Sequence, residues 1–246
     1  MAHPGAPAAA VVYEGKDLEA MAFAQNYHRW IADFFAPYLG KKVGEVGAGS
    51  GNFSSFLLES PVESLLAVEP SAQMFPLLAE KFKHEPRVVA RQALFRDVCG
   101  AYAGQLDSLV YVNVLEHIED DARELACAYE ALKEGGYLLI FVPALPALYS
   151  EFDASVGHFR HYRKRALVRL VGSAGFSVTK VRYFDMAGIL PWFVAMRLMR
   201  GGLNPRNTGL YDRFAVPVVR AFESVIPVPL GKNIILVARK QAAAQS

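Results

Sequence analysis

The stretch that decides the fold is Lys42-Val43-Gly44-Glu45-Val46-Gly47-Ala48-Gly49-Ser50-Gly51-Asn52-Phe53. It passes from a short apolar run with one acid, through three alternating glycines, into a segment with helical periodicity. It therefore predicts a strand, a tight turn and a helix. Glycine adopts positive φ and has no Cβ, so the backbone can turn sharply and lie against a ligand where the helix starts. The stretch predicts a cofactor-binding loop.

The spacing of the glycines indicates which cofactor the loop would hold. A dinucleotide fingerprint needs G-x-G-x-x-G, and its third glycine would fall where this chain has Asn52. Glu45 adds a carboxylate at the end of the strand, where it would repel a pyrophosphate and attract an ammonium group. The pattern favours a cationic ligand that carries a nucleoside.

The run from Glu45 to Gly51 resembles the first motif of class I S-adenosylmethionine (SAM)-dependent methyltransferases, and three further matches follow in the expected order. The resemblance extends from about Tyr27 to Gly175. It implies that SAM is the cofactor and that the loop contacts it through Glu45, Gly47, Ala48, Gly49 and Gly51. A glycine turn that serves only strand-helix packing would explain any one of these glycines, but not all three beside an acid.

Composition bounds the other classes of function. A chain of 246 residues with 53% hydrophobic content can bury the core of one α/β domain. A net charge of +2 gives no strong basic field, so we expect a small-molecule acceptor and no nucleic-acid partner. Cys99 and Cys127 lack metal-ligand spacing and are interpreted as thiols of a cytoplasmic protein. Met1 to Ala10 lacks the pattern of a signal peptide, and no apolar run reaches the ~18 residues of a membrane span.

Strands and helices alternate regularly from Val43 to Val142. The expected strands after the first are Leu65–Val68, Arg87–Ala90, Leu106–Asn113 and Tyr137–Pro143, with two more at Phe176–Tyr183 and Asn233–Arg239. This order predicts an α/β fold with a doubly wound, seven-stranded, mostly parallel sheet, the Rossmann-like fold of the resembling family, with a helical cap. Ligands of such sheets bind beyond the carboxyl ends of the strands.

Further cofactor contacts follow from position and from the resemblance. Glu69, followed by Pro70, ends the second strand and is placed to accept hydrogen bonds from both ribose hydroxyls. The resemblance implies adenine contacts at Ala93 and Leu94 and methionine contacts at Asn113 and Val114, although an ordinary loop explains Ala93 and Leu94 equally well. An amphipathic helix over Asp17–Tyr38 would fold over the cofactor and bring Met21 and Tyr27 with it; simple core packing is the alternative.

The run Val114-Leu115-Glu116-His117 resembles the ubiquinone-biosynthesis O-methyltransferases and their relatives. There the histidine is mostly architectural, so His117 is a secondary candidate for a base. Better candidates lie after Pro143, where the chain leaves the fifth strand: His158 and His161 as bases, with Asp153 to orient them. Tyr149, Asp153 and Arg160 are the expected substrate contacts of this loop. An equally weighted reading is that His158 and Arg160 only fasten the loop to the sheet.

An insertion from Phe184 to Lys232 separates the last two strands, which normally follow one another almost directly. It contains two apolar segments with arginines, Ile189–Arg200 and Tyr211–Phe222, and it supplies Trp192 as a candidate substrate contact. A lid over an apolar substrate, a homodimer contact and a peripheral membrane contact all suit this pattern.

The expected organisation has five parts: 1–40, a flexible tail and cap helix; 41–143, the SAM-binding core; 144–183, a substrate loop, helix and strand; 184–231, the helical cap insertion; and 232–246, the last strand and tail. The expected reaction is methyl transfer to a hydroxyl of an apolar or lipid-like acceptor without a metal. N- or C-methylation, and a non-catalytic SAM-binding module that contacts membrane or protein, are the alternatives. Glu45 and Asn52 disfavour a nicotinamide oxidoreductase.

Overall fold

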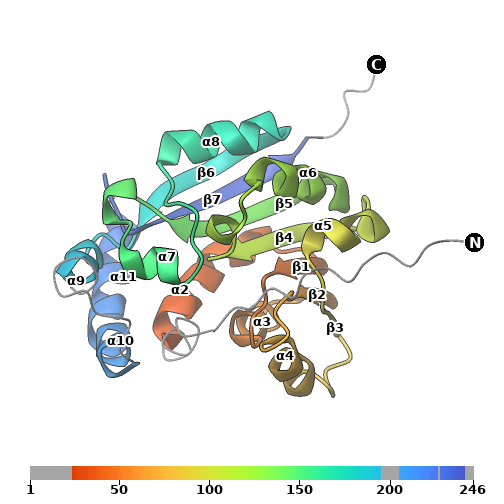
Figure 1. Cartoon of the computed structure of the whole chain (residues 1–246), viewed down its shortest axis with the longest axis horizontal. Helices are drawn as coiled ribbons and strands as arrows, with labels where there is room; N and C mark the ends of the chain where they lie inside the picture. The colour runs from red at the N-terminus through yellow and green to blue at the C-terminus, as the bar shows by residue number, and fades with distance from the viewer. Residues whose placement is uncertain (1–23, 195–204, 227, 242–246) are drawn as a thin grey trace, which may run out of the picture.

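A seven-stranded sheet forms the centre of the protein (Figure 1). The structure is a computed structural model that describes residues 24–194, 205–226 and 228–241. The strand order is β3-β2-β1-β4-β5-β7-β6, and all neighbours pair in parallel except β7, which is antiparallel to β5 and β6. The strands are β1 (Lys42–Val46), β2 (Ser64–Val68), β3 (Val88–Arg91), β4 (Leu106–Val112), β5 (Leu132–Pro143), β6 (Phe176–Phe184) and β7 (Asn233–Lys240). The expected fold class is confirmed.

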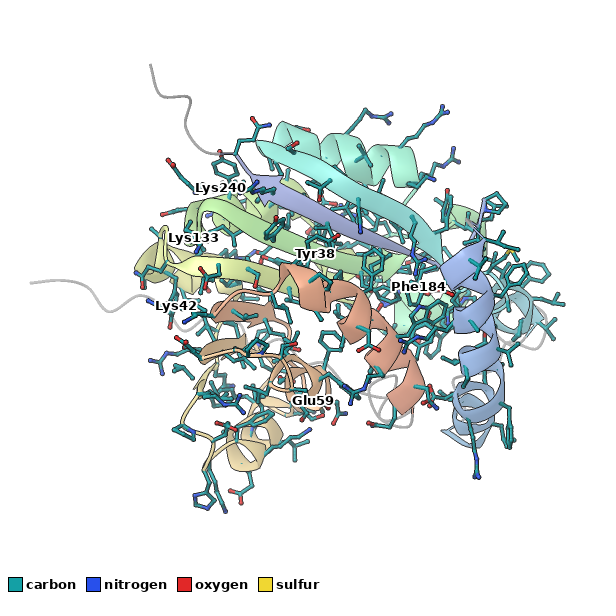
Figure 2. The ribbon with its side chains drawn as sticks, turned by 180° about the vertical axis from the view of Figure 1, so that it is seen from behind. Tyr38, Lys42, Glu59, Lys133, Phe184 and Lys240 are labelled. Atoms are coloured by element: carbon teal, nitrogen blue, oxygen red, sulfur yellow. The ribbon has the colours of Figure 1, made fainter. Side chains whose placement is uncertain are left out.

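Helices cover both faces of the sheet. One face carries α2 (Gln25–Phe35) with η1 (Ala36–Tyr38), α3 (Asn52–Leu57) and α11 (Val216–Val225). The other carries α5 (Phe95–Val98), η2 (Cys99–Tyr102), α6 (Asp121–Ala131) and α8 (Lys164–Ser173). Helix α4 (Phe75–Lys81) lies beside β3. Figure 2, seen from behind, shows α2 and α11 on the same face, with Phe184 labelled between them.

Strand β5 explains why its sequence is almost wholly apolar. Leu138 and Ile140 belong to the core cluster beneath α6 and α8, whereas Leu139 and Phe141 belong to the cluster beneath α2. All four side chains are fully buried. Successive side chains of a strand point to opposite faces, so a strand covered on both faces needs apolar residues at every position.

The sequence from Ser71 to Phe82 favours a helix that is capped by Ser71 and bent at Pro76, and the start of α4 differs from this prediction. The helix begins at Phe75, so Pro76 stands in its first turn, where a missing N–H leaves no hydrogen bond unmade. Ser71 instead closes the preceding turn, because its hydroxyl accepts from the amides of Gln73 and Met74. Pro76 therefore starts this helix and does not bend it.

The described part of the insertion between β6 and β7 contains helices joined to the strands by short turns. Helix α9 (Ile189–Trp192) begins the first expected segment, whose residues beyond Val194 lie outside the described part. The second segment is longer than expected: α10 (Pro205–Leu210), the π-helical turn η6 (Tyr211–Ala215) and α11 follow one another without a break. None of the helices in the described residues has both the length and the apolar character needed to span a bilayer. Met21 also lies outside the described residues.

Candidate functional site

A glycine turn joins β1 to α3. Gly47, Gly49 and Gly51 all have positive φ angles, of 69°, 57° and 80°. A Cβ atom on Gly47 would lie 2.5 Å from Cγ2 of Val114, and one on Gly51 would lie 2.5 Å from the ring of Phe82. Side chains are excluded at both positions because the turn packs tightly against the loop after β4 and the end of α4.

The amides of this turn are used inside the protein. Gly47 and Ala48 both donate to the carbonyl oxygen of Val68, at 2.8 and 3.1 Å. The Gly49 amide donates to Oε2 of Glu69 at 2.7 Å. A phosphate-binding loop needs backbone N–H groups that point at the ligand, and these three N–H groups point elsewhere. The turn therefore suits a ligand recognised by carboxylates better than a pyrophosphate.

Glu69 follows β2 and is buried at the edge of this turn. Its second oxygen, Oε1, accepts from the Ser71 amide at 2.8 Å. Burial raises the pKa of Glu69, although the hydrogen bonds from Ser71 and Gly49 oppose that shift. Each carboxylate oxygen holds one backbone hydrogen bond and keeps a lone pair for a second donor. This arrangement fits two ribose hydroxyls.

Glu45 is the next-to-last residue of β1 and is more deeply buried than Glu69, with 3% of its surface exposed. Its Oε2 accepts a short hydrogen bond from the Ser54 hydroxyl of α3. Burial raises the pKa of Glu45 to about 8; the Ser54 hydrogen bond opposes the shift, and the nearby Glu69 carboxylate adds to it. A cation bound here would favour the ionised form, so the residues present fit the ammonium and ribose groups of SAM.

The other expected cofactor contacts fall at the same edge of the sheet. Strands β1 to β4 are parallel, so their carboxyl ends meet there. Pro70 follows β2, Ala93 and Leu94 follow β3, and Asn113 and Val114 follow β4. Asn113 has a φ of 54°, unusual for a residue other than glycine, and its amide donates to the carbonyl of Phe141. Such backbone strain concentrates at functional sites.

Tyr27 lies elsewhere. Its side chain is 4% exposed, its ring makes edge contacts with Phe141 and Phe184, and its hydroxyl donates to Oδ1 of Asn233 at 3.0 Å. In this structure Tyr27 joins α2 to the start of β7. The alternative reading of Tyr27 as core packing accounts for these contacts, and a contact between Tyr27 and the cofactor stays a prediction.

Asp153 brings two histidines together in the loop after β5. Its Oδ1 lies 3.1 Å from Nδ1 of His158 and 2.8 Å from Nε2 of His161, while Oδ2 accepts from the amide and hydroxyl of Ser150. Burial would raise the pKa of the Asp153 carboxyl, but the hydrogen bonds from both histidines outweigh burial and hold it well below the ordinary range. Asp153 therefore stays ionised and accepts from both rings.

These hydrogen bonds assign the histidine tautomers. His158 carries its proton on Nδ1 and its lone pair on Nε2, whereas His161 has the reverse arrangement. The His161 side chain is buried, and its Nδ1 has no hydrogen-bond partner among the described residues. The His158 side chain is 10% exposed and packs against the ring of His117, with the ring centroids 4.5 Å apart. Of the two side chains, His158 is the more exposed.

His117 belongs to η3 (Leu115–His117), which follows the Asn113-Val114 segment directly. Burial, reinforced by the neighbouring His158, lowers the pKa of His117 to about 3. The amide of Phe159 donates to the carbonyl of Glu116 at 2.8 Å. The loop that carries His158 is thereby fastened to the loop after β4, whose Val114 packs on the glycine turn.

The remaining substrate candidates have mixed placements. Arg160 binds Oδ2 of Asp121 at 2.7 Å and the carbonyl of Glu119 at 2.8 Å, which fastens the loop to the start of α6. Tyr149 donates to the carbonyl of His158 at 2.7 Å. Trp192 of α9 makes an edge contact with Phe152 of α7 (Glu151–Ser155), so the insertion meets the substrate loop.

Sequence reasoning missed Ser150 and Tyr162. Ser150 and Asp153 form a capping box at the start of α7, and the spacing Ser-x-x-Asp before a helix was available as a signal. The hydroxyl of Tyr162 lies 2.8 Å from Oδ2 of Asp121 and 3.2 Å from the carbonyl of Leu115. Nothing in the sequence pairs Tyr162 with partners more than 40 residues earlier.

Two overlapping sets of donor atoms lie within 4.8 Å of one another: Glu116, His117 and His158, and Asp153, His158 and His161. In the second set the two histidine nitrogens lie at hydrogen-bond distance from Oδ1 of Asp153, at 3.1 and 2.8 Å. The first set has ligand types that a metal takes. The reaction expected from the sequence needs no ion, and that expectation stays a prediction.

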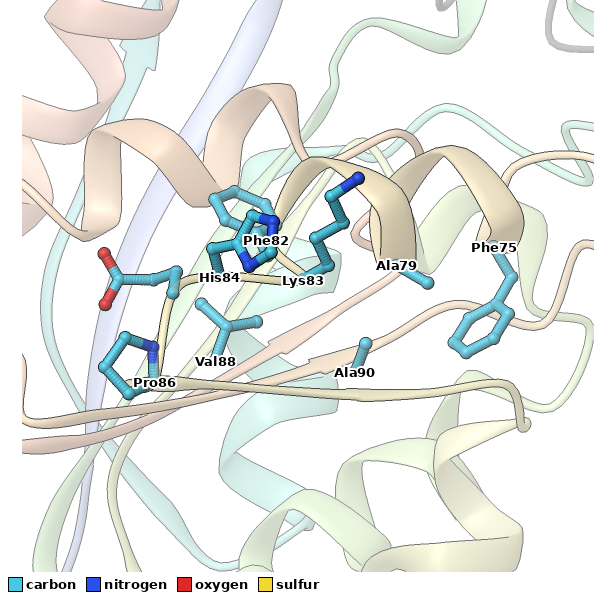
Figure 3. A pocket seen from close by; sticks show the side chains of 9 residues that line it. Phe75, Ala79, Phe82, Lys83, His84, Pro86, Val88 and Ala90 are labelled. Atoms are coloured by element: carbon cyan, nitrogen blue, oxygen red, sulfur yellow. The ribbon is translucent and has the colours of Figure 1, made fainter.

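Two open hollows on the described surface lie apart from this site. One, of about 450 Å³, lies between α4 and β3 and is lined by Phe75, Phe82 and Val88 among others (Figure 3). The other, of about 480 Å³, lies near the amino ends of β1 and β4, beside Tyr38 and Tyr137. Neither hollow is lined by a residue that is expected to bind cofactor or substrate, so neither one locates the candidate site.

Comparison with known proteins finds a family model that matches most of the chain. Residues 20–181 match the family model of the methyltransferase domain. A tRNA U34 carboxymethyltransferase of Helicobacter acinonychis is 28% identical over 103 residues, which make up 41% of this chain and 39% of that protein. The chain thus spans well under half the length of this relative, and the similarity concerns the shared domain.

Solved structures share the fold at low sequence identity. A SAM-dependent methyltransferase from Archaeoglobus fulgidus is similar with a TM-score of 0.60 at 16% identity, covering 91% of this chain and 99% of that one. A geranyl diphosphate methyltransferase in complex with GPP and sinefungin, a SAM analogue, has a TM-score of 0.60 at 15% identity, covering 85% and 76%. These similarities show the fold.

Proposed function

Because this chain belongs to the methyltransferase-domain family, we propose that it is a SAM-dependent methyltransferase and that it methylates a hydroxyl group of a small, apolar or lipid-like molecule. The observation that carries this proposal is the pairing of Asp153 with His158 beside η3. An ionised acid fixes the ring of a histidine through Nδ1, and we assign the proton acceptor to the other ring nitrogen, Nε2. We also assign the chain to the ubiquinone-biosynthesis O-methyltransferase-like branch, on the run Val114–His117.

SAM supplies an electrophilic methyl group on a sulfonium. In the proposed reaction the acceptor oxygen bonds to the methyl carbon, the carbon–sulfur bond breaks, and the hydroxyl proton passes to Nε2 of His158. Asp153 holds the ring through Nδ1 and stabilises the imidazolium that forms. Protein groups on the loops after β1 and β4 hold the cofactor, and the loop after β5 holds the base.

The three candidate histidines differ in how well each could act as a general base. His117 is a weak base because its pKa is lowered to about 3. The lone pair of His161 lies on a buried nitrogen. His158 alone combines a partly exposed ring with an acid that orients it, so we assign the base to His158 and a positioning role to His161.

The cap supports an apolar acceptor. The contact between Phe152 and Trp192 brings aromatic side chains of the loop after β5 and of the insertion together. We propose that the parts 144–183 and 184–231 form the acceptor side of the site and that 41–143 forms the SAM side.

Cys99 and Cys127 are both free thiols, which supports a reducing, cytoplasmic location.

Methyl-labelled SAM distinguishes the classes of acceptor. The full-length protein is incubated with the lipid extract, the aqueous metabolite extract and the bulk tRNA of bacterial cells, each in a separate reaction. We expect label in the lipid extract. Label in tRNA alone would overturn the proposed acceptor and point instead to tRNA, the class of acceptor named for the Helicobacter relative. Binding of S-adenosylhomocysteine with no label in any pool would favour a non-catalytic module.

The base is tested by His158→Gln, with His161→Gln as the matched control on the same acid. Loss of a positioned base typically lowers kcat by ~100-fold to 10,000-fold. We expect a loss of this size for His158→Gln, with unchanged S-adenosylhomocysteine binding and loss of the acid limb of the pH profile. We expect His161→Gln to keep the shape of that profile. Near-normal kcat in His158→Gln would make the histidine structural.

A further inference from the structure

The helix that runs through α10, η6 and α11 exposes one apolar side. Its exposed residues, called here the apolar stripe, are Leu210, Phe214, Val218, Phe222 and Val225, each between 48% and 80% exposed. Their spacing of three or four residues places them along one side of the helix. Figure 2 shows this helix at the end of the molecule, with side chains that project into solvent.

The opposite side of the same helix already attaches it to the protein. Asp212 accepts hydrogen bonds from the amides of Asn26 and Tyr27, at 3.0 and 2.8 Å, and so occupies the start of α2. Val216 is 1% exposed in the core cluster. Glu223 accepts from the amide of Met186 at 2.7 Å, just after β6. The apolar stripe is therefore a second, outward side of a helix whose packing is complete.

The charges of the insertion divide by sign. From Gly188 to Leu230 the sequence contains five arginines and only two acids, Asp212 and Glu223. Both acids are buried, at 4% and 2% exposure, and bind backbone amides. Arg213 is exposed and lies over the ring of Phe214 at 5.5 Å, whereas Arg220 pairs with Asp33 of α2. Where its side chains are described, the insertion thus presents apolar groups and Arg213 to solvent, and its two acids in this range face inward.

More apolar surface lies at the same end of the molecule. Leu190 of α9 is 69% exposed, and Ile226 and Leu230, which follow α11, are about half exposed. Figure 1 places α9 beside α10 and α11 at this end. Contiguous apolar surface of this kind marks a contact with another apolar phase.

We propose that the apolar stripe docks this protein on an anionic lipid bilayer. An interfacial helix inserts apolar side chains between lipids while arginines at its edge bind anionic headgroups, and the stripe with Arg213 has both features. A second copy of the chain fits less well, because two copies packed stripe against stripe would each bring an Arg213 to the same interface. A lid would need the stripe to face the sheet, and that side of the helix is already packed on α2.

Sedimentation with lipid vesicles tests the proposal without any methyl transfer, so its outcome is separate from the proposed reaction. The full-length protein is mixed with vesicles of phosphatidylcholine alone or of equal parts phosphatidylcholine and phosphatidylglycerol. We expect binding to the mixed vesicles that weakens with salt. Phe214→Glu and Phe222→Glu are each expected to lower the partition coefficient by about tenfold or more, since each removes a large inserted side chain.

Leu77→Glu is the matched control, because Leu77 of α4 is 54% exposed but lies outside the stripe. It is expected to bind vesicles as the unchanged protein does. Binding of S-adenosylhomocysteine by every variant confirms that each is folded. Failure of the unchanged protein to bind either vesicle would overturn the proposal, as would full binding by Phe214→Glu and Phe222→Glu. A dimer in solution that Phe214→Glu dissociates would assign the stripe to a second copy.

Discussion

Replacing Glu45 by glutamine tests the electrostatics of the cofactor loop. Burial holds the pKa of the Glu45 carboxyl at about 8 in the folded protein, against 4.5 for an unperturbed glutamate. Between these values the folded protein holds a proton on Glu45 that the unfolded chain releases. Rising pH therefore favours unfolding, so the stability that Glu45 contributes is complete below about pH 4.5 and is lost as the pH rises through about 8.

The size of the effect follows from one proton. A single proton released on unfolding lowers the free energy of unfolding by ~1.4 kcal/mol per pH unit. From about pH 5.5 to 7.5 the difference between the unchanged protein and Glu45→Gln should therefore fall by ~2.7 kcal/mol. Glutamine keeps an acceptor for the Ser54 hydroxyl and does not titrate, and groups common to both proteins cancel in the difference.

Urea unfolding measures this difference, followed by fluorescence of the buried Trp30. The unfolding free energy is determined at several pH values for the unchanged protein, for Glu45→Gln and for Glu134→Gln, whose side chain is exposed. A difference between the unchanged protein and Glu45→Gln that does not vary with pH would mean that Glu45 ionises as it does in water. The argument from burial would then be wrong.

Three further predictions concern the ribose contact, the glycine turn and the need for a metal. Glu69→Gln is expected to weaken S-adenosylhomocysteine binding by ~1 to 3 kcal/mol in titration calorimetry, and unchanged affinity would move the ribose contact elsewhere. Gly51→Ala is expected to lower stability in thermal unfolding by ~1 to 3 kcal/mol, because φ is 80° and the new Cβ meets Phe82; Gly172→Ala in α8, with nothing within 4 Å, is the control and should not destabilise. Treatment with a chelator is expected to leave methyl transfer unchanged, and activity restored only by added metal would contradict this.

Features with local causes were predictable from the sequence. The glycine turn between β1 and α3, the acid at the end of β2 and the two-sided burial of β5 each follow from a few neighbouring residues. The start of α4 was not predictable, because Pro76 suits both a bend and a first turn. The choice depended on the hydrogen bonds that Ser71 makes in the preceding turn.

The candidate site was predictable as a set of residues but not as a set of contacts. The sequence placed Asp153, His158 and His161 on one loop, yet only the path of that loop decides which ring faces inward. Arg160 was expected to meet substrate, and its partner in this structure is Asp121, 39 residues earlier. Tyr27 meets Asn233, 206 residues later. No local pattern encodes pairs at such separations.

The position of β7 between β5 and β6 constrains how the chain can fold during synthesis. Strand β6 has no sheet neighbour in the described structure except β7, which leaves the ribosome after the other six strands of this sheet. Helix α2 is made before every strand of the sheet, yet Asp212, which accepts from the amide of Tyr27, follows that residue by 185 positions. The sheet is therefore completed only after β7 has left the ribosome, and a ribosome stalled before Asn233 would hold an open sheet whose β5 edge is free to pair with other chains.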